Sequence, residues 1–176
     1  MEFPKRKSPR ADWYDYAGGM YFVTVVTRNR NKYFGEINNG VMSLNSLGAF
    51  LDTELQNIQQ HYHYARLINH VVMPNHFHAI IYIEENMLPK KLRSVEKVFE
   101  SNNPLEKAHL AKNWLSTIVG GIKSCVTRYA NNNSMKFSWQ TRYHDHIIRG
   151  NRDFDLISKY IDSNAANWDL DCFNAP

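Results

Sequence analysis

The sequence predicts an α+β fold with an antiparallel sheet, and three observations support this prediction. Runs of β-branched and aromatic residues with the length of strands recur at residues 21–27, 65–73 and 76–83. Two longer stretches, 46–61 and 105–130, repeat apolar residues at helical spacing. The runs 65–73 and 76–83 are joined by only Pro-Asn, and so short a connection indicates an antiparallel pair.

In the first half of the chain, the predicted strands are separated by a predicted turn and a predicted helix. An Asn39-Gly40 pair after the first strand predicts a turn. The helix predicted at 46–61 follows, and its apolar stripe consists of Leu47, Leu51, Leu55 and Ile58. Residues 84–104, after the two paired strands, are charged and carry Pro and Asn, which is typical of a surface excursion.

The second half begins with the helix predicted at 105–130. Gly120 and Gly121 lie in its middle, where each costs about 1 kcal/mol relative to alanine, so we expect another group to approach closely there. Residues 137–149 are predicted as the last strand.

A final helix is expected after the last strand. Asn151 or Asp153 is predicted to cap it, and Phe154, Ile157 and Ile161 are predicted on its buried side. The complete order is βαββαβ, which is ferredoxin-like: an antiparallel sheet with helices on one face and an added C-terminal helix.

Length and composition favour one domain over residues 1–176, because a chain of this size buries about 70% of its unfolded surface. Cys125 and Cys172 are too few for a disulfide framework or a zinc-thiolate site, and no apolar stretch resembles a signal peptide or spans a bilayer. We therefore expect a cytoplasmic protein without a membrane partner. The net charge of +4 and the pI near 9.0 weakly favour a polyanionic partner.

His76 and His78 form a His-x-His pair in the strand predicted at 76–83. Side chains alternate faces along a strand, so both imidazoles project from one face and Phe77 from the other. Neutral imidazole is the commonest protein ligand for metals, but a catalytic site needs at least one more ligand. The spacing alone is equally compatible with two polar residues on a half-exposed strand.

Tyr160 and Asn164 lie four residues apart on the last helix and are therefore neighbours on one of its sides. An amide oxygen could complete a hard-cation site built on two histidines, which would place the tyrosine beside the ion. A divalent ion makes a phosphodiester electrophilic enough for attack by a tyrosine. The alternative is that Tyr160 only packs against the sheet.

A second His-x-His pair gives a rival metal site. His144 and His146 flank Asp145 on the last predicted strand, and the two pairs together could assemble a four-histidine centre of an oxygenase or hydrolase. The spacing of the residues does not reject this arrangement.

Several blocks of the sequence resemble one family when they are taken in order. These blocks are RKSPRADWYDYAGGMYFVTVVTRNR, FGEI, VVMPNHFHAIIYI, LSTIVGGIKSCVTRYAN, WQTRYHDHIIR and YIDSNAANW. They resemble the REP-associated tyrosine transposases, which are relatives of the single-tyrosine HUH transposases of bacterial insertion sequences. The resemblance covers nearly the whole chain.

The resemblance implies a metal-dependent endonuclease and strand transferase acting on single-stranded DNA. It implies His76, His78 and Asn164 as ligands of Mg²⁺ or Mn²⁺, and Tyr160 as the nucleophile that forms a 5′-phosphotyrosine. Relatives often have Asn-Pro where this chain has Asn164-Ala165. The four-histidine alternative is disfavoured by the resemblance, because relatives keep the DHIIR block without using it as a ligand.

The resemblance also implies hairpin DNA from repetitive extragenic palindromes as the partner, in a bacterial cytoplasm at the nucleoid. Relatives include homodimers and monomers, and the sequence does not select between them. The alternative function is that of a DNA-hairpin-binding protein that derives from a transposase and has lost useful cleavage. We expect the DNA contacts on the basic arm at 1–20, through Arg6, Lys7 and Arg10, and on cations elsewhere, namely Arg28, Arg30, Lys112, Lys123, Arg128 and Arg142.

Overall fold

The computed structural model describes residues 19–88 and 104–174. Nearly all of the basic arm predicted at 1–20 and most of the surface excursion predicted at 84–104 lie outside the described residues. The same holds for the side chains of four DNA-contact candidates, namely Arg6, Lys7, Arg10 and Lys112.

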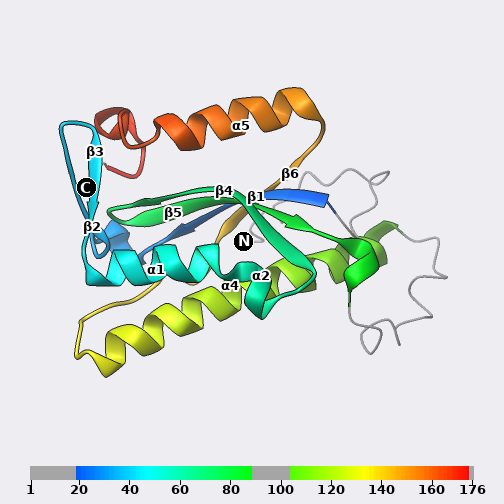
Figure 1. The fold of residues 1–176 in the computed structure, drawn as a ribbon, viewed down its shortest axis with the longest axis horizontal. Helices are drawn as coiled ribbons and strands as arrows, with labels where there is room; N and C mark the ends of the chain where they lie inside the picture. The colour runs from blue at the N-terminus through cyan, green and yellow to red at the C-terminus, as the bar shows by residue number, and fades with distance from the viewer. Residues whose placement is uncertain (1–18, 89–103, 175–176) are drawn as a thin grey trace, which may run out of the picture.

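Within the described residues, four strands form the main sheet in the order β4-β5-β1-β6, and every neighbouring pair is antiparallel. The strands are β1 (Gly19–Val26), β4 (Ala65–Met73), β5 (His76–Ile83) and β6 (His144–Ile148). Each of the two βαβ connections places its strands on either side of a third strand, as Figure 1 shows. The ferredoxin-like prediction is confirmed.

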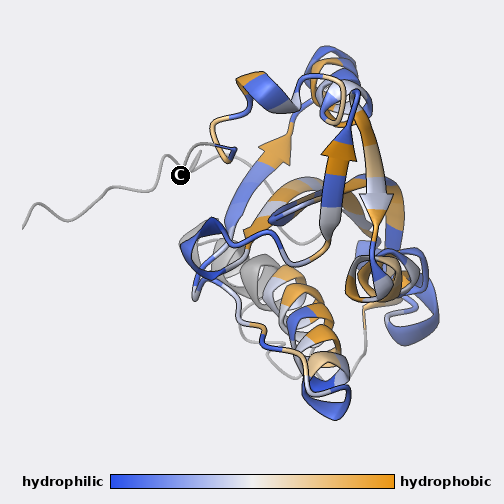
Figure 2. Ribbon diagram, turned by 90° about the vertical axis from the view of Figure 1, so that its left-hand side faces the viewer, coloured by the Kyte–Doolittle hydropathy of each residue, from blue (hydrophilic) through white to orange (hydrophobic). Residues whose placement is uncertain are grey.

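Helices cover both faces of this sheet (Figure 1). One face carries α1 (Ser46–Gln56), α2 (Ile58–His61) and α4 (Pro104–Asn132), and the other carries α5 (Asn151–Ser163). The larger core lies under the first three helices and includes Phe77 and Ala79 of β5. The smaller core lies under α5, where Ile161 packs against Ile80 and Ile148. Figure 2 shows the hydrophobic residues concentrated on the strands and on the helix sides that meet them.

A hairpin of β2 (Gly35–Asn38) and β3 (Val41–Leu44) precedes α1. Asn39 and Gly40 form its turn with φ angles of 53° and 74°, which confirms the turn predicted from this pair. The Asn45 side chain then accepts hydrogen bonds from the backbone N–H groups of Leu47 and Gly48, and so caps α1.

The first predicted helix, 46–61, is broken into α1 and α2 at Asn57. The backbone of Asn57 leaves the helical region, with φ −88° and ψ 8°, and the second helix is only one turn long. The apolar stripe is nevertheless continuous, because Leu55 and Ile58 are both buried.

The helix predicted at 105–130 is confirmed as α4. The close approach expected at its glycine pair occurs at one of the two positions. A Cβ on Gly121 would collide with the hydroxyl end of Tyr62, whereas a Cβ on Gly120 would meet nothing. The approaching group is a side chain that packs against the helix.

The last strand is much shorter than the predicted 137–149, because β6 begins only at His144. Before it, Phe137 and Trp139 turn inward and pack on Phe34 at ring distances of 5.7 and 5.3 Å. A single bridge between Thr27 and Trp139 is the remaining strand-like contact. The aromatic residues of this stretch serve as core packing, which composition alone did not distinguish from a strand.

The cap predicted for the last helix is also wrong. Gly150 occupies the N-cap position, with φ 91° and no side-chain bond. Asp153 instead accepts a hydrogen bond from the backbone N–H of Arg149 and contacts His146. The helix ends at Ser163, and the chain continues through turns into a short 3₁₀ helix, η4 (Trp168–Leu170). Two further 3₁₀ helices are η1 (Arg28–Arg30) and η2 (Glu85–Met87).

No helix in the described ranges combines the length and apolar character that a membrane crossing requires.

Candidate functional site

His76 and His78 project from the face of β5 that α5 covers, and both are buried. Phe77 and Ala79 project into the larger core on the opposite face. The strand periodicity therefore placed both imidazoles correctly on one face.

The neighbouring Asn75 determines which ring nitrogen of His76 carries the proton. The Asn75 amide nitrogen donates to the carbonyl oxygens of Arg30 and Phe173, at 3.1 and 2.8 Å. Its oxygen is therefore the atom that faces His76 Nδ1, at 2.8 Å, and it accepts the Nδ1–H. This hydrogen bond leaves the lone pair of His76 on Nε2.

Each ring nitrogen of His78 has a hydroxyl neighbour. Its Nδ1 lies 2.9 Å from Thr24 Oγ1, and its Nε2 lies 3.2 Å from the Tyr160 hydroxyl oxygen. The two Nε2 atoms lie 3.1 Å apart. Two ring nitrogens this close can coordinate one bound cation together.

Burial keeps the two imidazoles neutral. It lowers the pKa of His76 well below 6.5, and the neighbouring His78 adds to this effect. Burial alone lowers the pKa of His78 to about 3. The neutral imidazole, with a lone pair on one ring nitrogen, is the form in which histidine binds metal.

Tyr160 and Asn164 come from the end of α5, which Ile161 anchors to the sheet. Asn164 is the C-cap residue and is 3% exposed, and its Oδ1 has no hydrogen-bond partner. Tyr160 is 42% exposed. Burial raises the pKa of Tyr160, the Asp171 carboxylate raises it further, and a hydrogen bond with Asn164 opposes the rise. The phenol therefore stays protonated at neutral pH.

Sequence reasoning missed Asp171. Its Oδ2 lies 3.9 Å from His76 Nε2, is buried and has no hydrogen-bond partner. The ligand atoms of His76, His78 and Asp171 all lie within 4.8 Å of one another. Trp168 and Phe173 pack beside His76 at ring distances of 6.1 and 4.6 Å and bring the carboxylate there. No spacing signal marks such a residue, because its position depends on turns after the helix.

His76, His78 and Asp171 form a group that could hold a metal ion. Asp171 Oδ2 and the Asn164 amide oxygen are buried polar atoms without hydrogen-bond partners. Such atoms are costly in a folded protein unless something binds them. The donor set of two imidazoles and a carboxylate fits a divalent cation.

The four-histidine centre does not form. β1 lies between β5 and β6, so the second pair is two strand spacings, about 9.5 Å, from the first. His144 and His146 are exposed, and His146 contacts Asp153 at 3.0 Å.

The candidate DNA contacts fall in two places. Arg30 lies beside the histidine site, where its guanidinium donates to the Cys172 carbonyl at 2.9 Å and covers the Phe173 ring. Lys123 and Arg128 lie on α4, on the other face of the sheet. Arg28 and Arg142 are exposed in the segments next to these places.

Comparison with known proteins finds a relative by sequence and a solved structure with a similar fold. No family model matches the chain. An uncharacterized protein of Haemophilus influenzae is 34% identical over 173 residues, which cover 94% of this chain and 91% of that protein. The solved structure of a REP-associated tyrosine transposase bound to a REP hairpin aligns with a TM-score of 0.58 at 19% identity, over 92% of this chain and 74% of that one. The chain therefore belongs to the family of the Haemophilus protein, and it is related in fold to the REP-associated tyrosine transposases.

Proposed function

We propose that the protein is a metal-dependent enzyme that cuts and joins single-stranded DNA through Tyr160. The observation that carries this proposal is the contact between the Tyr160 hydroxyl and His78 Nε2. It places the one exposed hydroxyl of the cluster next to the converging ligand atoms. A structural tyrosine would not need two buried oxygen atoms without partners in its surroundings, Asp171 Oδ2 and Asn164 Oδ1.

His76, His78, Asn164 and Asp171 would hold the ion. A bound Mg²⁺ or Mn²⁺ would polarise a non-bridging phosphoryl oxygen and neutralise the charge that develops on it. The chain's own contribution is to orient both imidazoles through Asn75 and Thr24 and to hold Tyr160 beside them.

The reaction would be a transesterification. The Tyr160 oxygen forms a bond to phosphorus, and the bond from phosphorus to the 3′ oxygen breaks. Tyr160 loses its proton to solvent and the leaving 3′ oxygen gains one, which gives a 5′-phosphotyrosine and a free 3′-OH. The phosphodiester bond energy is conserved, so joining needs no further energy source.

The surroundings of Tyr160 support a single-stranded substrate. A cavity of about 370 Å³ opens beside its hydroxyl and is lined by Ser163, Asn164, Asn167, Leu170, Asp171 and Cys172. Leu156, one turn before Tyr160 on α5, is 61% exposed, and Leu170, which lines the cavity, is 86% exposed. Unpaired bases offer apolar faces to such side chains, whereas paired and stacked bases do not. The structural relative bound to a REP hairpin makes a hairpin with a single-stranded flank the substrate to test first.

The test is a cleavage assay on hairpin oligonucleotides labelled at the 5′ or the 3′ end, with Mg²⁺ or Mn²⁺. We expect a cut strand and a protein-bound fragment, both abolished by EDTA and by Tyr160→Phe. Tyr82→Phe, which changes an exposed tyrosine elsewhere on the sheet, is the matched control and should cut normally.

His76→Ala separates catalysis from binding. It should abolish cutting and leave hairpin affinity largely unchanged, because the ion acts on the scissile phosphate only. Tight binding without cutting by the unmodified protein in either metal would contradict the enzymatic proposal and support a DNA-binding derivative.

A further inference from the structure

The edge strand β4 contains one more residue than its neighbour β5 over the stretch where they pair. Leu67 pairs with Ile81 and Asn69 pairs with Ile80, so Ile68 is the extra residue of a β-bulge. Ile68 is 44% exposed. A shift of one residue turns every following side chain to the opposite face of the sheet. The bulge therefore decides which helices are contacted by the residues that come after it.

The first two residues after the bulge contact helices on opposite faces of the sheet. Asn69 pairs with Ile80, whose side chain lies in the smaller core under α5. His70 pairs with Ala79, which lies in the larger core, and its Nε2 lies 2.7 Å from Asp52 Oδ1 of α1. In an uninterrupted strand, the alternation of side chains would turn Asn69 toward α1 and away from α5.

Two hydrogen bonds connect Asn69 to α5. The Asn69 amide nitrogen donates to Ser158 Oγ and to Asp162 Oδ1, each at 2.9 Å. Ser158 and Asp162 are four residues apart, so they lie on one side of the helix. Asn69 and Ser158 are both half-buried, which reduces competition from water for this contact.

Tyr160 leaves α5 on the side opposite to these bonds. At about 100° per residue, its side chain is about 200° around the helix from that of Ser158. The Tyr160 hydroxyl lies 3.2 Å from His78 Nε2, and its ring lies 6.2 Å from that of Phe22 on β1. Ile161 comes between the two sides and packs on the sheet. The helix is therefore connected to β4 on one side and meets the histidine site on the other.

The apolar contacts of α5 alone leave its rotation about its own axis loosely fixed. Phe154, Ile157 and Ile161 pack against the sheet, and apolar contact is non-directional, whereas hydrogen bonds weaken steeply when their geometry changes. A rotation of about 10° moves a side-chain end that is about 6 Å from the helix axis by about 1 Å. A misplacement of about 1 Å can lower a reaction rate about 100-fold.

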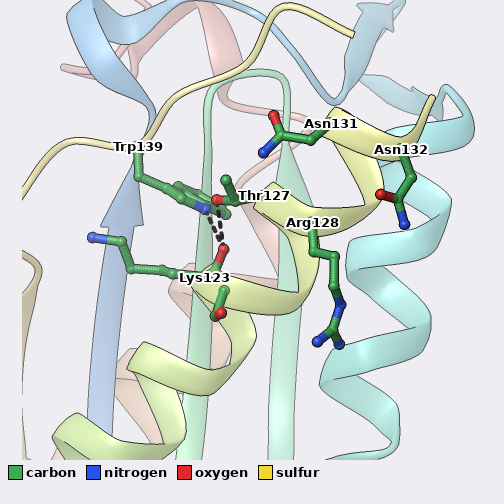
Figure 3. A pocket seen from close by; sticks show the side chains of 7 residues that line it. Lys123, Thr127, Arg128, Asn131, Asn132 and Trp139 are labelled. Carbon is green, nitrogen blue, oxygen red and sulfur yellow. Dashed lines mark hydrogen bonds between the residues drawn. The ribbon is translucent and has the colours of Figure 1, made fainter. Parts of the chain in front are cut away.

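The helices on the other face are fastened by separate contacts. The carbonyl oxygen of Lys123 in α4 accepts hydrogen bonds from Thr127 Oγ1 and Trp139 Nε1, at 2.7 and 3.1 Å (Figure 3). His70 connects β4 to α1. The residues of the histidine site all lie outside α1 and α4. A contact to either helix is therefore a suitable control for a contact to α5.

We propose that Asn69 is a positioning residue for Tyr160. Its hydrogen bonds to Ser158 and Asp162 fix the rotation of α5, and they thereby hold the phenol at the distance from His78 that attack on a phosphate requires. The proposal rests on the proposed function for the identity of the reaction. It assigns part of the reaction rate to a side chain on the edge strand that touches neither the histidines nor the cavity beside Tyr160.

The first test compares Asn69→Ala with His70→Ala. Each variant removes one side-chain contact that the bulge creates, and the two contacts lie on opposite faces of the sheet. The rate of adduct formation is measured at saturating hairpin DNA and Mn²⁺, and the dissociation constant of the hairpin is measured by fluorescence anisotropy. Asn69→Ala should lower the rate about 10-fold or more and leave the dissociation constant unchanged. His70→Ala should change neither. Equal rates in the two variants would overturn the proposal.

A rescue experiment separates positioning from a loss of stability. Asn69→Asp places a second carboxylate against Asp162 and should lower the rate as Asn69→Ala does. Adding Asp162→Asn supplies an amide donor to the new carboxylate, so the double variant should recover most of the rate. A double variant that melts at the temperature of the unmodified protein but stays slow would contradict the role of this hydrogen bond.

The position of Tyr160 is also measured without DNA or metal. The protein is labelled with ¹³C-tyrosine, and the Tyr160 signal in the NMR spectrum is assigned with Tyr160→Phe. Asn69→Ala should shift this signal, because the ring moves relative to His78 and Phe22, and His70→Ala should leave it in place. An unshifted signal in Asn69→Ala would overturn the proposal. If the unmodified protein forms no adduct, the proposed function fails, and the NMR comparison still decides whether Asn69 positions Tyr160.

Discussion

The Tyr160 hydroxyl lies within hydrogen-bond distance of Nε2 of His78, at 3.2 Å, although the two residues are 82 positions apart. The contact requires β5 to present its even-numbered face to α5 and requires α5 to be anchored by Ile161. The proposed nucleophile and a proposed metal ligand therefore meet at the interface between the sheet and a helix that was added to the basic fold. The predictions that follow test the parts of this interface.

Thr24 should control metal affinity through His78. Thr24→Val keeps the side-chain shape but removes the partner of His78 Nδ1. We expect Mn²⁺ affinity, measured by isothermal titration calorimetry, to fall about 10- to 100-fold. Thr27→Val is the matched control, because it also removes a buried threonine hydrogen bond, to the Asn31 carbonyl. Thr27→Val should leave metal affinity unchanged. An equal loss of metal affinity in both variants would mean that Thr24 affects the metal only by stabilising β1.

Asp171 should be a ligand that the metal-free fold does not need. Asp171→Asn keeps the volume and removes the charge, so Mn²⁺ affinity should fall roughly tenfold or more. The melting temperature of the metal-free protein should not fall, because the carboxylate oxygen there has no partner. Asp169→Asn, in the exposed part of η4, is the control and should have no effect on Mn²⁺ binding. Unchanged Mn²⁺ affinity in Asp171→Asn would remove this residue from the site.

The two histidines should make the metal-free protein sensitive to acid. Burial lowers the pKa of His78 from 6.5 to about 3, and it lowers the pKa of His76 as well. Between these values the unfolded chain binds protons that the folded protein does not, so the free energy of unfolding decreases as the pH falls below 6.5. Urea denaturation between pH 4 and 8 should show this slope. His78→Gln should make the slope shallower, and an identical slope in that variant would contradict the assignment.

Replacing Gly120 or Gly121 of α4 by alanine should change the stability of the protein in opposite directions. Gly120→Ala adds a methyl group where nothing lies within 4 Å, and it should stabilise the protein by about 1 kcal/mol. Gly121→Ala meets the Tyr62 hydroxyl, which donates to the Thr117 carbonyl, and it should destabilise by about 1 to 3 kcal/mol. Thermal denaturation of the two variants measures the difference. Stabilisation by both would show that Tyr62 moves aside freely.

The periodicity of apolar and polar residues predicted those features of the structure that depend only on the local sequence. The alternation in β5 placed His76 and His78 on one face, and the helical spacing of Tyr160 and Asn164 placed both side chains at the site. These contacts need only the period of an element and the order of the elements.

The missed features depend on contacts between distant segments. Residues 137–143 carry the composition of a strand, but Phe137 and Trp139 pack on Phe34 and leave the sheet. Asp171 reaches His76 because the chain turns back after Asn164 and Trp168 packs against the imidazole. Neither arrangement produces a repeating pattern of residues, so neither could be predicted from one amino-acid sequence.

The most direct measurement is to locate the covalent bond between protein and DNA. The protein is incubated with Mn²⁺ and a hairpin oligonucleotide, the adduct is digested with protease and nuclease, and the modified peptide is identified by mass spectrometry. A phosphonucleotide on Tyr160, linked through the 5′ phosphate, is the result that we predict. A modified residue other than Tyr160, or cut DNA that never carries a bound peptide, would contradict the tyrosine mechanism.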